Sequence, residues 1–202
     1  MTNFVKQAFA GLRLLLVLTV ITGILYPLAV WGVSRIPGLQ GNAEGSVISV
    51  NGAAVGSGLI GVDLVAADPN NDPWFHTRPS ALSADPLGPA DPSSSLASNK
   101  SALNPDYTAV VQERRNAIAA REGVSPDQVP QDAVTASASG LDPQISVAYA
   151  DLQAARVAKV TGVPVDRVLQ LISANTDGRG LGFLGEPGVN VLMLNLAVQA
   201  AG

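Results

Sequence analysis

The longest uninterrupted apolar run lies near the N-terminus. From residue 14 to residue 33 the chain reads LLLVLTVITGILYPLAVWGV, with no charged residue. As a helix that rises about 1.5 Å per residue, this run is about 30 Å long, which matches the hydrocarbon core of a bilayer. The pattern therefore predicts one transmembrane helix at residues 14–33.

A cleaved signal peptide is the alternative interpretation of this run. Its apolar core is usually only about 7 to 15 residues long and ends in small residues, whereas this run is longer and has a bulky aromatic residue where the small one should be. Lys6 and Arg13 precede the run and Arg35 alone follows it closely. The positive-inside rule then predicts a short cytoplasmic N-terminus at residues 1–13 and an extracytoplasmic domain at residues 37–202.

Proline and glycine inside the run suggest packing against other helices. Pro27 removes a backbone hydrogen bond to the carbonyl of Gly23, so we expect a kink there. Bent spans with glycine often pack closely on neighbouring helices, which makes Gly23 and Pro27 candidates for partner contact. A simple anchor that tolerates its proline is the alternative. Trp31 is expected at the outer interface of the membrane.

The pattern after the apolar run predicts a β-hairpin followed by a long irregular segment. Residues 46–50 and the residues from Ala53 onward read as two short strands joined by Asn51-Gly52, a pair that readily takes the positive φ angles of a type I′ turn. Residues 66–103 are rich in Pro, Ser and Asp and contain four Asp-Pro pairs, which favours turns over regular elements. A loop of this length in a compact domain is more often functional than idle.

The rest of the chain predicts several helices. Asn104-Pro105 reads as an N-cap and first helical residue, with Gly123 as the stop. Asp142-Pro143 repeats this device, with Gly162 as the stop, and a third helix is expected at residues 165–173. Residues 188–196 suit a buried strand or a buried short helix, and periodicity does not decide between them. The expected fold class is α+β: one transmembrane helix and a single mixed extracytoplasmic domain with a β-hairpin and several helices.

Composition and charge exclude several classes of chemistry. The chain has no Cys and one His, which excludes disulfides, thiolate metal sites, cysteine nucleophiles and multi-histidine zinc sites, so no metal site is predicted. After residue 36 there are nine Lys or Arg against all sixteen Asp and Glu, a net charge of −7. Such an acidic domain disfavours nucleic acid and other phosphate-rich ligands.

Nucleotide chemistry within this chain is not expected. Residues 180–185 match G-x-G-x-x-G, but a dinucleotide site needs a strand before that motif and a helix after it, whereas a loop-like stretch precedes it and Glu186-Pro187 follows. The chain also has neither a P-loop nor an Asp-Lys-Thr-Gly phosphorylation motif. We therefore predict no catalytic residue and no directly bound cofactor.

One segment gathers residue types that are scarce elsewhere in the chain. We favour a structural interpretation, in which its aromatic residues fill the core and Arg78 binds carbonyls or a carboxylate. The alternatives are a partner-binding surface and a membrane-anchored extracytoplasmic hydrolase or binding module built on His76 and Arg78, although no Gly-x-Ser-x-Gly elbow supports a hydrolase. The candidate contact residues here are Trp74, Phe75, His76, Arg78, Pro79 and Ser80.

Several motifs, taken together and in order, resemble the C subunit of the Kdp potassium-transporting ATPase. The two longest are the Trp74–Ala81 segment and the Asp132–Asp142 segment, VTASASGLD at its core. Shorter matches are Tyr26-Pro27, Gly56–Gly61, Arg156–Ala158 and Gly188–Leu196. The resemblance covers nearly the whole chain.

The resemblance implies a non-catalytic subunit of a bacterial high-affinity potassium importer in the cell membrane. The implied partners are a channel-like potassium-binding subunit (KdpA-like), a P-type ATPase subunit (KdpB-like) and a small membrane peptide (KdpF-like), with ATP and potassium handled by these partners. The family is described as stabilising the complex and as a catalytic chaperone that raises the affinity of the ATPase subunit for ATP. A helix glutamine proposed to touch nucleotide corresponds to Gln153, which from the residues alone reads as an ordinary solvated or capping side chain. Since an outer domain cannot reach cytosolic ATP, we expect any effect on ATP to be indirect.

Overall fold

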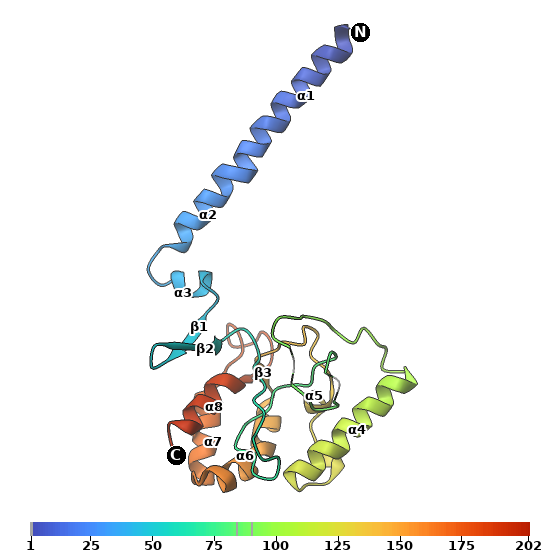
Figure 1. Ribbon diagram of the computed structural model, residues 1–202, viewed down its shortest axis with the longest axis vertical. Coiled ribbons are helices and arrows are strands. Elements are labelled where there is room, and N and C mark those ends of the chain that lie inside the picture. Colours follow the sequence, from blue (N-terminus) through green and yellow to red (C-terminus); the bar gives the residue numbers. More distant parts are fainter. Residues whose placement is uncertain (1, 84, 90) are drawn as a thin grey trace. The chain divides into compact units, whose positions relative to one another are not determined.

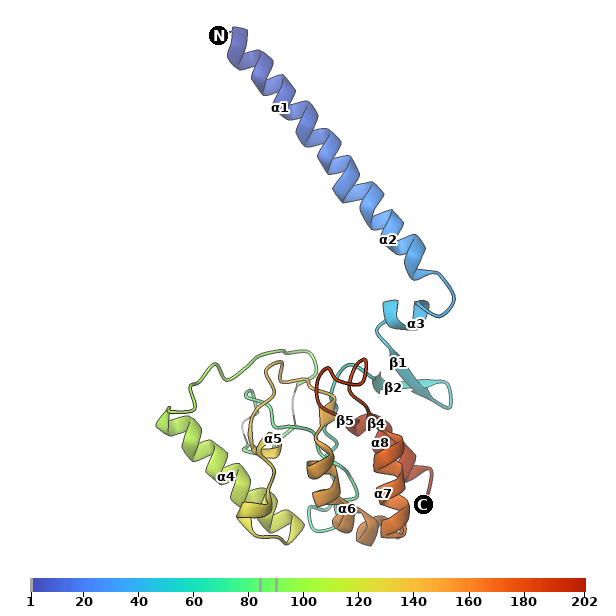
Figure 2. The same cartoon turned by 180° about the vertical axis from the view of Figure 1, so that it is seen from behind.

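The computed structural model describes residues 2–83, 85–89 and 91–202. The chain divides into two compact units, Met1–Val47 and Ile48–Gly202 (Figures 1 and 2). The first unit is helical and the second is a mixture of helices and short strands. This agrees with the α+β prediction.

The first unit is dominated by one long apolar helix. It comprises α1 (Thr2–Val20), the π-helical turn η1 (Ile21–Leu25) and α2 (Tyr26–Ser34), followed by the short α3 (Gln40–Ala43). The stretch Asn3–Ser34 is long and apolar enough to cross a membrane, and none of it is buried within the chain. The helix starts at Thr2, before the predicted span, so Lys6 and Arg13 also lie on it.

A π turn lies just before Pro27, where a kink was predicted. The Tyr26 N–H donates to the carbonyl of Ile21, five residues earlier, and Pro27 occupies the first turn of α2. A regular α-helix would press the proline ring against the carbonyl of Gly23, and the wider π turn changes the alignment at that point. The ribbon continues from α1 into α2 without a break (Figure 1).

The second unit begins with the predicted hairpin. Strands β1 (Val47–Val50) and β2 (Ala53–Ser57) form a two-stranded sheet. Asn51 and Gly52 have φ angles of 51° and 79°, as a type I′ turn requires. The described residues between 58 and 104 form no helix or named strand, which confirms the long irregular segment.

The first predicted helix of this unit is confirmed together with its caps. Helix α4 (Pro105–Glu122) is capped by Asn104, whose side chain accepts from the Tyr107 N–H, and it ends at Gly123 with φ 69°. A 3₁₀ turn, η2 (Pro126–Gln128), and a single helical turn, α5 (Gln131–Val134), follow.

The predicted start of the next helix was wrong. Asp142-Pro143 does not begin a helix; it precedes strand β3 (Gln144–Ile145), and α6 (Val147–Thr161) starts after Ser146, whose hydroxyl accepts from the Tyr149 N–H. The Asp142 carboxylate is occupied instead by the Gln144 N–H at 3.0 Å and by Arg78 at 3.1 Å.

A small antiparallel sheet and three helices complete the unit. After α7 (Val165–Ala174), which confirms the third helix, come β4 (Thr176–Asp177), β5 (Gly188–Asn190) and α8 (Val191–Gln199). The sheet order is β3-β5-β4, with Ile145 opposite Val189 and Thr176 opposite the same residue. Residues 188–196 are thus a strand and a helix in succession, so both open alternatives hold. The core lies where α6, α7 and α8 meet the sheet and the 58–104 segment, whose Phe75 is completely buried.

Candidate functional site

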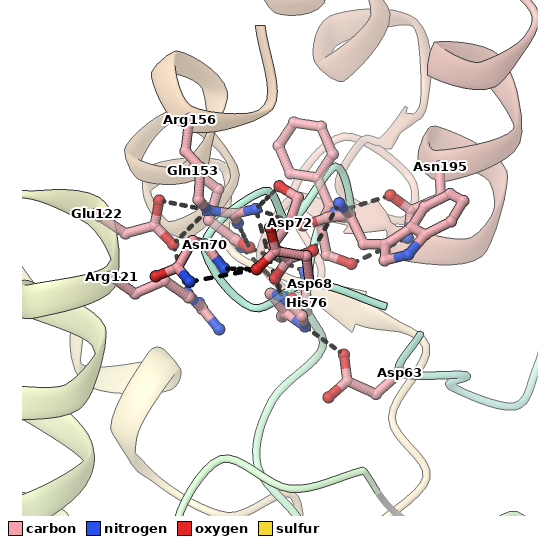
Figure 3. Close-up of polar contacts among 12 residues, drawn as sticks. Asp63, Asp68, Asn70, Asp72, His76, Arg121, Glu122, Gln153, Arg156 and Asn195 are labelled. Carbon is pink, nitrogen blue, oxygen red and sulfur yellow. Dashed lines mark hydrogen bonds and ion pairs between the residues drawn. The ribbon is translucent and has the colours of Figure 1, made fainter. Parts of the chain in front are cut away.

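An extended segment around residues 74–77 passes through the core between two side-chain amides (Figure 3). Asn195 of α8 accepts from the Phe75 N–H at 2.8 Å and donates to the Phe75 carbonyl at 2.9 Å. Gln153 of α6 accepts from the His76 N–H at 2.8 Å and donates to the His76 carbonyl at 3.4 Å. Neighbouring residues of an extended chain turn their backbone groups to opposite sides. The two amides, here called the amide clamps, therefore replace the two strands that would flank this segment in a sheet.

The single histidine lies between two carboxylates. Its Nδ1 is 2.9 Å from Asp63 Oδ1, and its Nε2 is 2.6 Å from Asp72 Oδ2. An ionised carboxylate only accepts hydrogen bonds, so both ring nitrogens act as donors. The imidazole therefore carries a proton on each nitrogen and is positively charged. His76 is thus a doubly paired cation in this structure.

The environment of His76 shifts pKa values in opposite directions. Burial acts to lower the pKa of His76, but the hydrogen bonds to Asp63 and Asp72 outweigh it and raise the pKa above its ordinary value. Burial acts to raise the pKa of Asp72, but the hydrogen bond and charge of His76, the Trp74 N–H and the charge of Arg156 together outweigh it and lower that pKa. The His76 contribution to stability is therefore complete below about pH 6.5 and is lost as the pH rises through the raised pKa. The Asp72 contribution is complete above about pH 4 and is lost as the pH falls through the lowered pKa.

The ion-pair network continues from Asp72 to helices α4 and α6. Arg156 donates to the Asp72 and Trp74 carbonyls at 2.7 and 3.0 Å, and its Nε lies 3.0 Å from the fully buried carboxylate of Glu122. The same carboxylate accepts from Arg121 Nε at 2.7 Å. The network as a whole has three carboxylates and three cations. The carboxylates are Asp63, Asp72 and Glu122, and the cations are His76, Arg121 and Arg156. Breaking one buried pair of this kind typically costs about 3–5 kcal/mol, so the network fixes the 72–76 segment to both helices.

Two further arginines bind backbone carbonyls of the irregular segment and its neighbours. Arg78 donates to the Asp142 carboxylate at 3.1 Å and to the carbonyls of Thr135 and Ala136 at 3.4 Å. The buried Arg114 of α4 donates to the carbonyls of Pro86 and Ser80 at 2.9 and 3.1 Å. The structural interpretation of the Trp74–Ala81 segment is confirmed for Phe75 and Arg78.

A cavity of about 450 Å³ adjoins His76. Its walls come from four parts of the chain: residues 63–66, the segment from Pro69 to His76, residues 85–89 and one face of α4. Carboxylates, His76 and Arg121 line it together with Leu and Pro side chains. Among the residues that the structure describes, no cluster of His, Asp and Glu could hold a metal ion.

This arrangement offers no reactive group. A general base needs a free ring nitrogen next to the proton that it removes, and a hydrolytic histidine needs a hydroxyl nucleophile within about 3 Å. Both nitrogens of His76 are bound to carboxylates, and no hydroxyl is among the partners of its ring in the described part of the chain. The geometry gives the hydrolase alternative no support.

The structure brings together some of the predicted contact residues and separates others. Trp74 to Ser80 lie on one continuous segment, but Phe75, Pro79 and Ser80 are buried, while Trp74, His76 and Arg78 are partly buried. Gly23 and Pro27 lie on the exposed N-terminal helix.

Gln153 departs from its interpretation as a solvated or capping helix residue, which was wrong. Its side chain is completely buried, and besides His76 it also contacts the Tyr149 carbonyl at 3.3 Å and Arg156 at 3.2 Å. Every polar atom of the amide is thus already bound within the chain.

Sequence reasoning missed most of the polar network. The missed residues are Asp63, Asp72, Arg114, Arg121, Glu122 and Asn195. One signal could have pointed to the arginines: the chain has nine Arg but only three Lys. Arginine is preferred where a guanidinium binds several acceptors in a buried position. No local pattern marks the carboxylates or Asn195.

The described residues contain one apolar helix of membrane-spanning length, followed by a mixed α+β unit, which is the arrangement of a membrane-associated protein. Comparison with known proteins gives the family. The sequence model described as KdpC, the c chain of K⁺-transporting ATPases, matches residues 8–200. The chain belongs to this family.

Curated relatives match this chain over nearly their full length. The potassium-transporting ATPase KdpC subunit of Kineococcus radiotolerans is 46% identical over 201 residues, which cover 100% of this chain and 97% of the relative. The subunit of the same name from Streptomyces coelicolor is 45% identical, covering 98% and 94%, and that from Mycobacterium tuberculosis is 44% identical, covering 96% and 98%.

Proposed function

We propose that this chain is the non-catalytic accessory subunit of an ATP-driven potassium importer. Residues 14–33 span the cell membrane, residues 1–13 are cytoplasmic, and residues 37–202 form the domain outside. The partners are a channel-like potassium-binding subunit, a P-type ATPase subunit and a small membrane peptide. Family membership supports the assembly, and the distribution of Lys and Arg around the span supports the orientation.

The observation that carries this proposal is the helix Asn3–Ser34. It presents apolar side chains on all sides, and none of them is covered by the rest of the chain. An uncovered surface of this size is stable only in lipid or against other membrane helices. Gly23 gives one face of the helix a small residue, and a Cβ added there would have only Thr19 within 4.0 Å, so a partner helix can approach closely at this point.

The role is assembly rather than chemistry because neither His76 nor Gln153 has a free polar group to offer. His76 is paired on both sides and the amide of Gln153 is saturated within the core. Nucleotide contact at Gln153 would require the His76 backbone to give up its partner. We therefore propose that the chaperone effect on ATP affinity is indirect: the subunit favours the ATP-competent state of its partner through a coupling free energy.

Co-purification tests the assembly. A tagged chain, co-expressed with the potassium-binding and ATPase subunits, should retain both in mild detergent, and Gly23→Leu should lower their recovery. Gly32→Leu is the matched control, since Gly32 also lies on this helix with nothing within 4 Å of a Cβ. If the wild-type chain recovers neither subunit, the proposal fails.

Protease protection tests the orientation. In sealed inside-out vesicles the domain at residues 37–202 should resist protease until detergent is added. Digestion in intact vesicles would place this domain on the cytosolic side, and the indirect explanation of the ATP effect would then be wrong.

A further inference from the structure

The loop between β4 and β5 exposes a compact group of large apolar side chains. Leu181, Phe183 and Leu184 are 84%, 70% and 54% exposed. They lie within the G-x-G-x-x-G motif of residues 180–185, to which the proposed function assigns no role. These three side chains are called the apolar tip here.

The apolar tip is held by a defined small turn. The Gly180 N–H donates to the Leu184 carbonyl and the Leu184 N–H donates back, both at 2.8 Å. Gly182 and Gly185 have φ angles of 83° and 79°, which suit glycine, so the motif here serves the turn. At the base of the loop, Arg179 and Glu186 form an ion pair at 2.6 Å. The chain thus orders three large apolar side chains where water surrounds them.

The position of the loop within the second unit brings it toward the point where the chain enters. Both views show the loop between β4 and β5 at the same end of this unit as β1 (Figures 1 and 2). Only residues 35–46 separate the long apolar helix from β1, and a segment of this length reaches at most about 40 Å when fully extended. If the helix spans a membrane, as the proposed function holds, the start of β1 stays within that distance of the membrane end of the helix.

We propose that the apolar tip inserts into the boundary between headgroups and acyl chains of the bilayer that holds the chain's own helix. This rests on the proposed function for the membrane anchor. Lipid suits the tip better than a protein groove because its side chains carry no hydrogen-bonding group and the nearest charges, Arg179 and Glu186, neutralise each other. Because residues 35–46 connect the second unit to the membrane helix, insertion of the tip is intramolecular. Three apolar side chains then suffice where a free protein would need a larger surface.

The charge of the unit sets the kind of membrane contact. Residues 37–202 carry a net charge of −7, which opposes adsorption to anionic lipid. The contact therefore depends on apolar burial, occurs on zwitterionic phosphatidylcholine and is insensitive to salt.

Site-directed fluorescence tests the insertion directly, since the chain has no native cysteine. Leu181→Cys in the full chain is labelled with an environment-sensitive nitrobenzoxadiazole dye and reconstituted into phosphatidylcholine nanodiscs containing spin-labelled lipid. We expect at least about a twofold quenching of the dye, equal at low and high salt. The matched control is Val165→Cys, an exposed residue at the start of α7, where quenching should be absent.

The outcomes separate this proposal from the one on which it rests. If the chain washes off the nanodiscs, the anchor is wrong and both proposals fail. If the chain is retained but the dye at residue 181 remains in water, only the insertion of the tip is wrong. Shielding that appears only after the partner subunits are added would assign the tip to a protein contact and would also overturn insertion into lipid.

Discussion

Replacing Gln153 by Met distinguishes a structural amide from a nucleotide ligand. Met has nearly the same length and volume, so it fills the space that Gln153 leaves, but it can neither accept from the His76 N–H at 2.8 Å nor donate to the His76 carbonyl. A buried N–H without a partner costs about 1–3 kcal/mol. We expect the free energy of unfolding to fall by about 2 kcal/mol after the gain from the more apolar side chain is included.

Urea unfolding of the full chain in mild detergent measures this loss. Trp74 lies beside the clamps, so its fluorescence reports on the segment once Trp31→Phe has removed the only other tryptophan. With a slope of about 2 kcal/mol per molar urea, the midpoint should fall by about 1 M. Gln170→Met is the matched control, because Gln170 is exposed on α7, and it should cost less than about 0.5 kcal/mol.

The apparent KM for ATP of the assembled transporter is the second measurement, and it can refute the structural role of Gln153. If Gln153 were a nucleotide ligand, Gln153→Met would leave the urea midpoint unchanged and raise the apparent KM for ATP. That pair of results would refute the reasoning. A structural amide predicts the opposite pair of results: the urea midpoint falls, and the apparent KM for ATP equals that of the wild type in complexes that remain assembled.

Three further changes test the network and the packing around it by the same urea unfolding. His76→Gln should lower stability and remove the pH dependence above about pH 6.5, where the wild type loses stability as the pH rises through its raised histidine pKa; parallel pH profiles would contradict the doubly paired imidazolium. Asn195→Leu should cost about 2–4 kcal/mol because it leaves a buried backbone N–H and carbonyl unpaired, and an unchanged midpoint would show that the second clamp is dispensable. Gly61→Ala should cost about 2 kcal/mol or more because its Cβ would meet a backbone carbonyl, while Gly178→Ala, with open space at that atom, should stay within about 0.5 kcal/mol; equal losses would contradict this close approach.

Sequence patterns predicted the elements whose signals are local. Helix α4 has its N-cap, its first-turn proline and its terminal glycine within its own residues, and all three work as expected. Asp142-Pro143 looks the same locally, yet Arg78, 64 residues away, holds its carboxylate, and Ser146 provides the cap instead. The start of α6 was therefore missed because a distant contact decides it.

The centre of the site was beyond sequence reasoning for the same physical reason. Gln153 and Asn195 lie on helices with no unusual pattern, and their partners are backbone groups 77 and 120 residues away. A backbone N–H has no sequence signature, so nothing in either segment announces the pairing. Aromatic residues and His are scarce in this chain, so their presence at residues 74–81 singled out this segment. It did not reveal that side chains of two helices bind the segment from both sides.

The two clamps also impose an order on the synthesis of the chain. Gln153 is made before Asn195, which lies 42 residues later in the sequence. The 74–77 segment can therefore gain its first amide partner before its second has been made. Contacts between such distant residues form slowly because a long loop must close first. A nascent chain that stops before α8 therefore leaves this segment held from one side only, open to proteases and to quality control until α8 has been made.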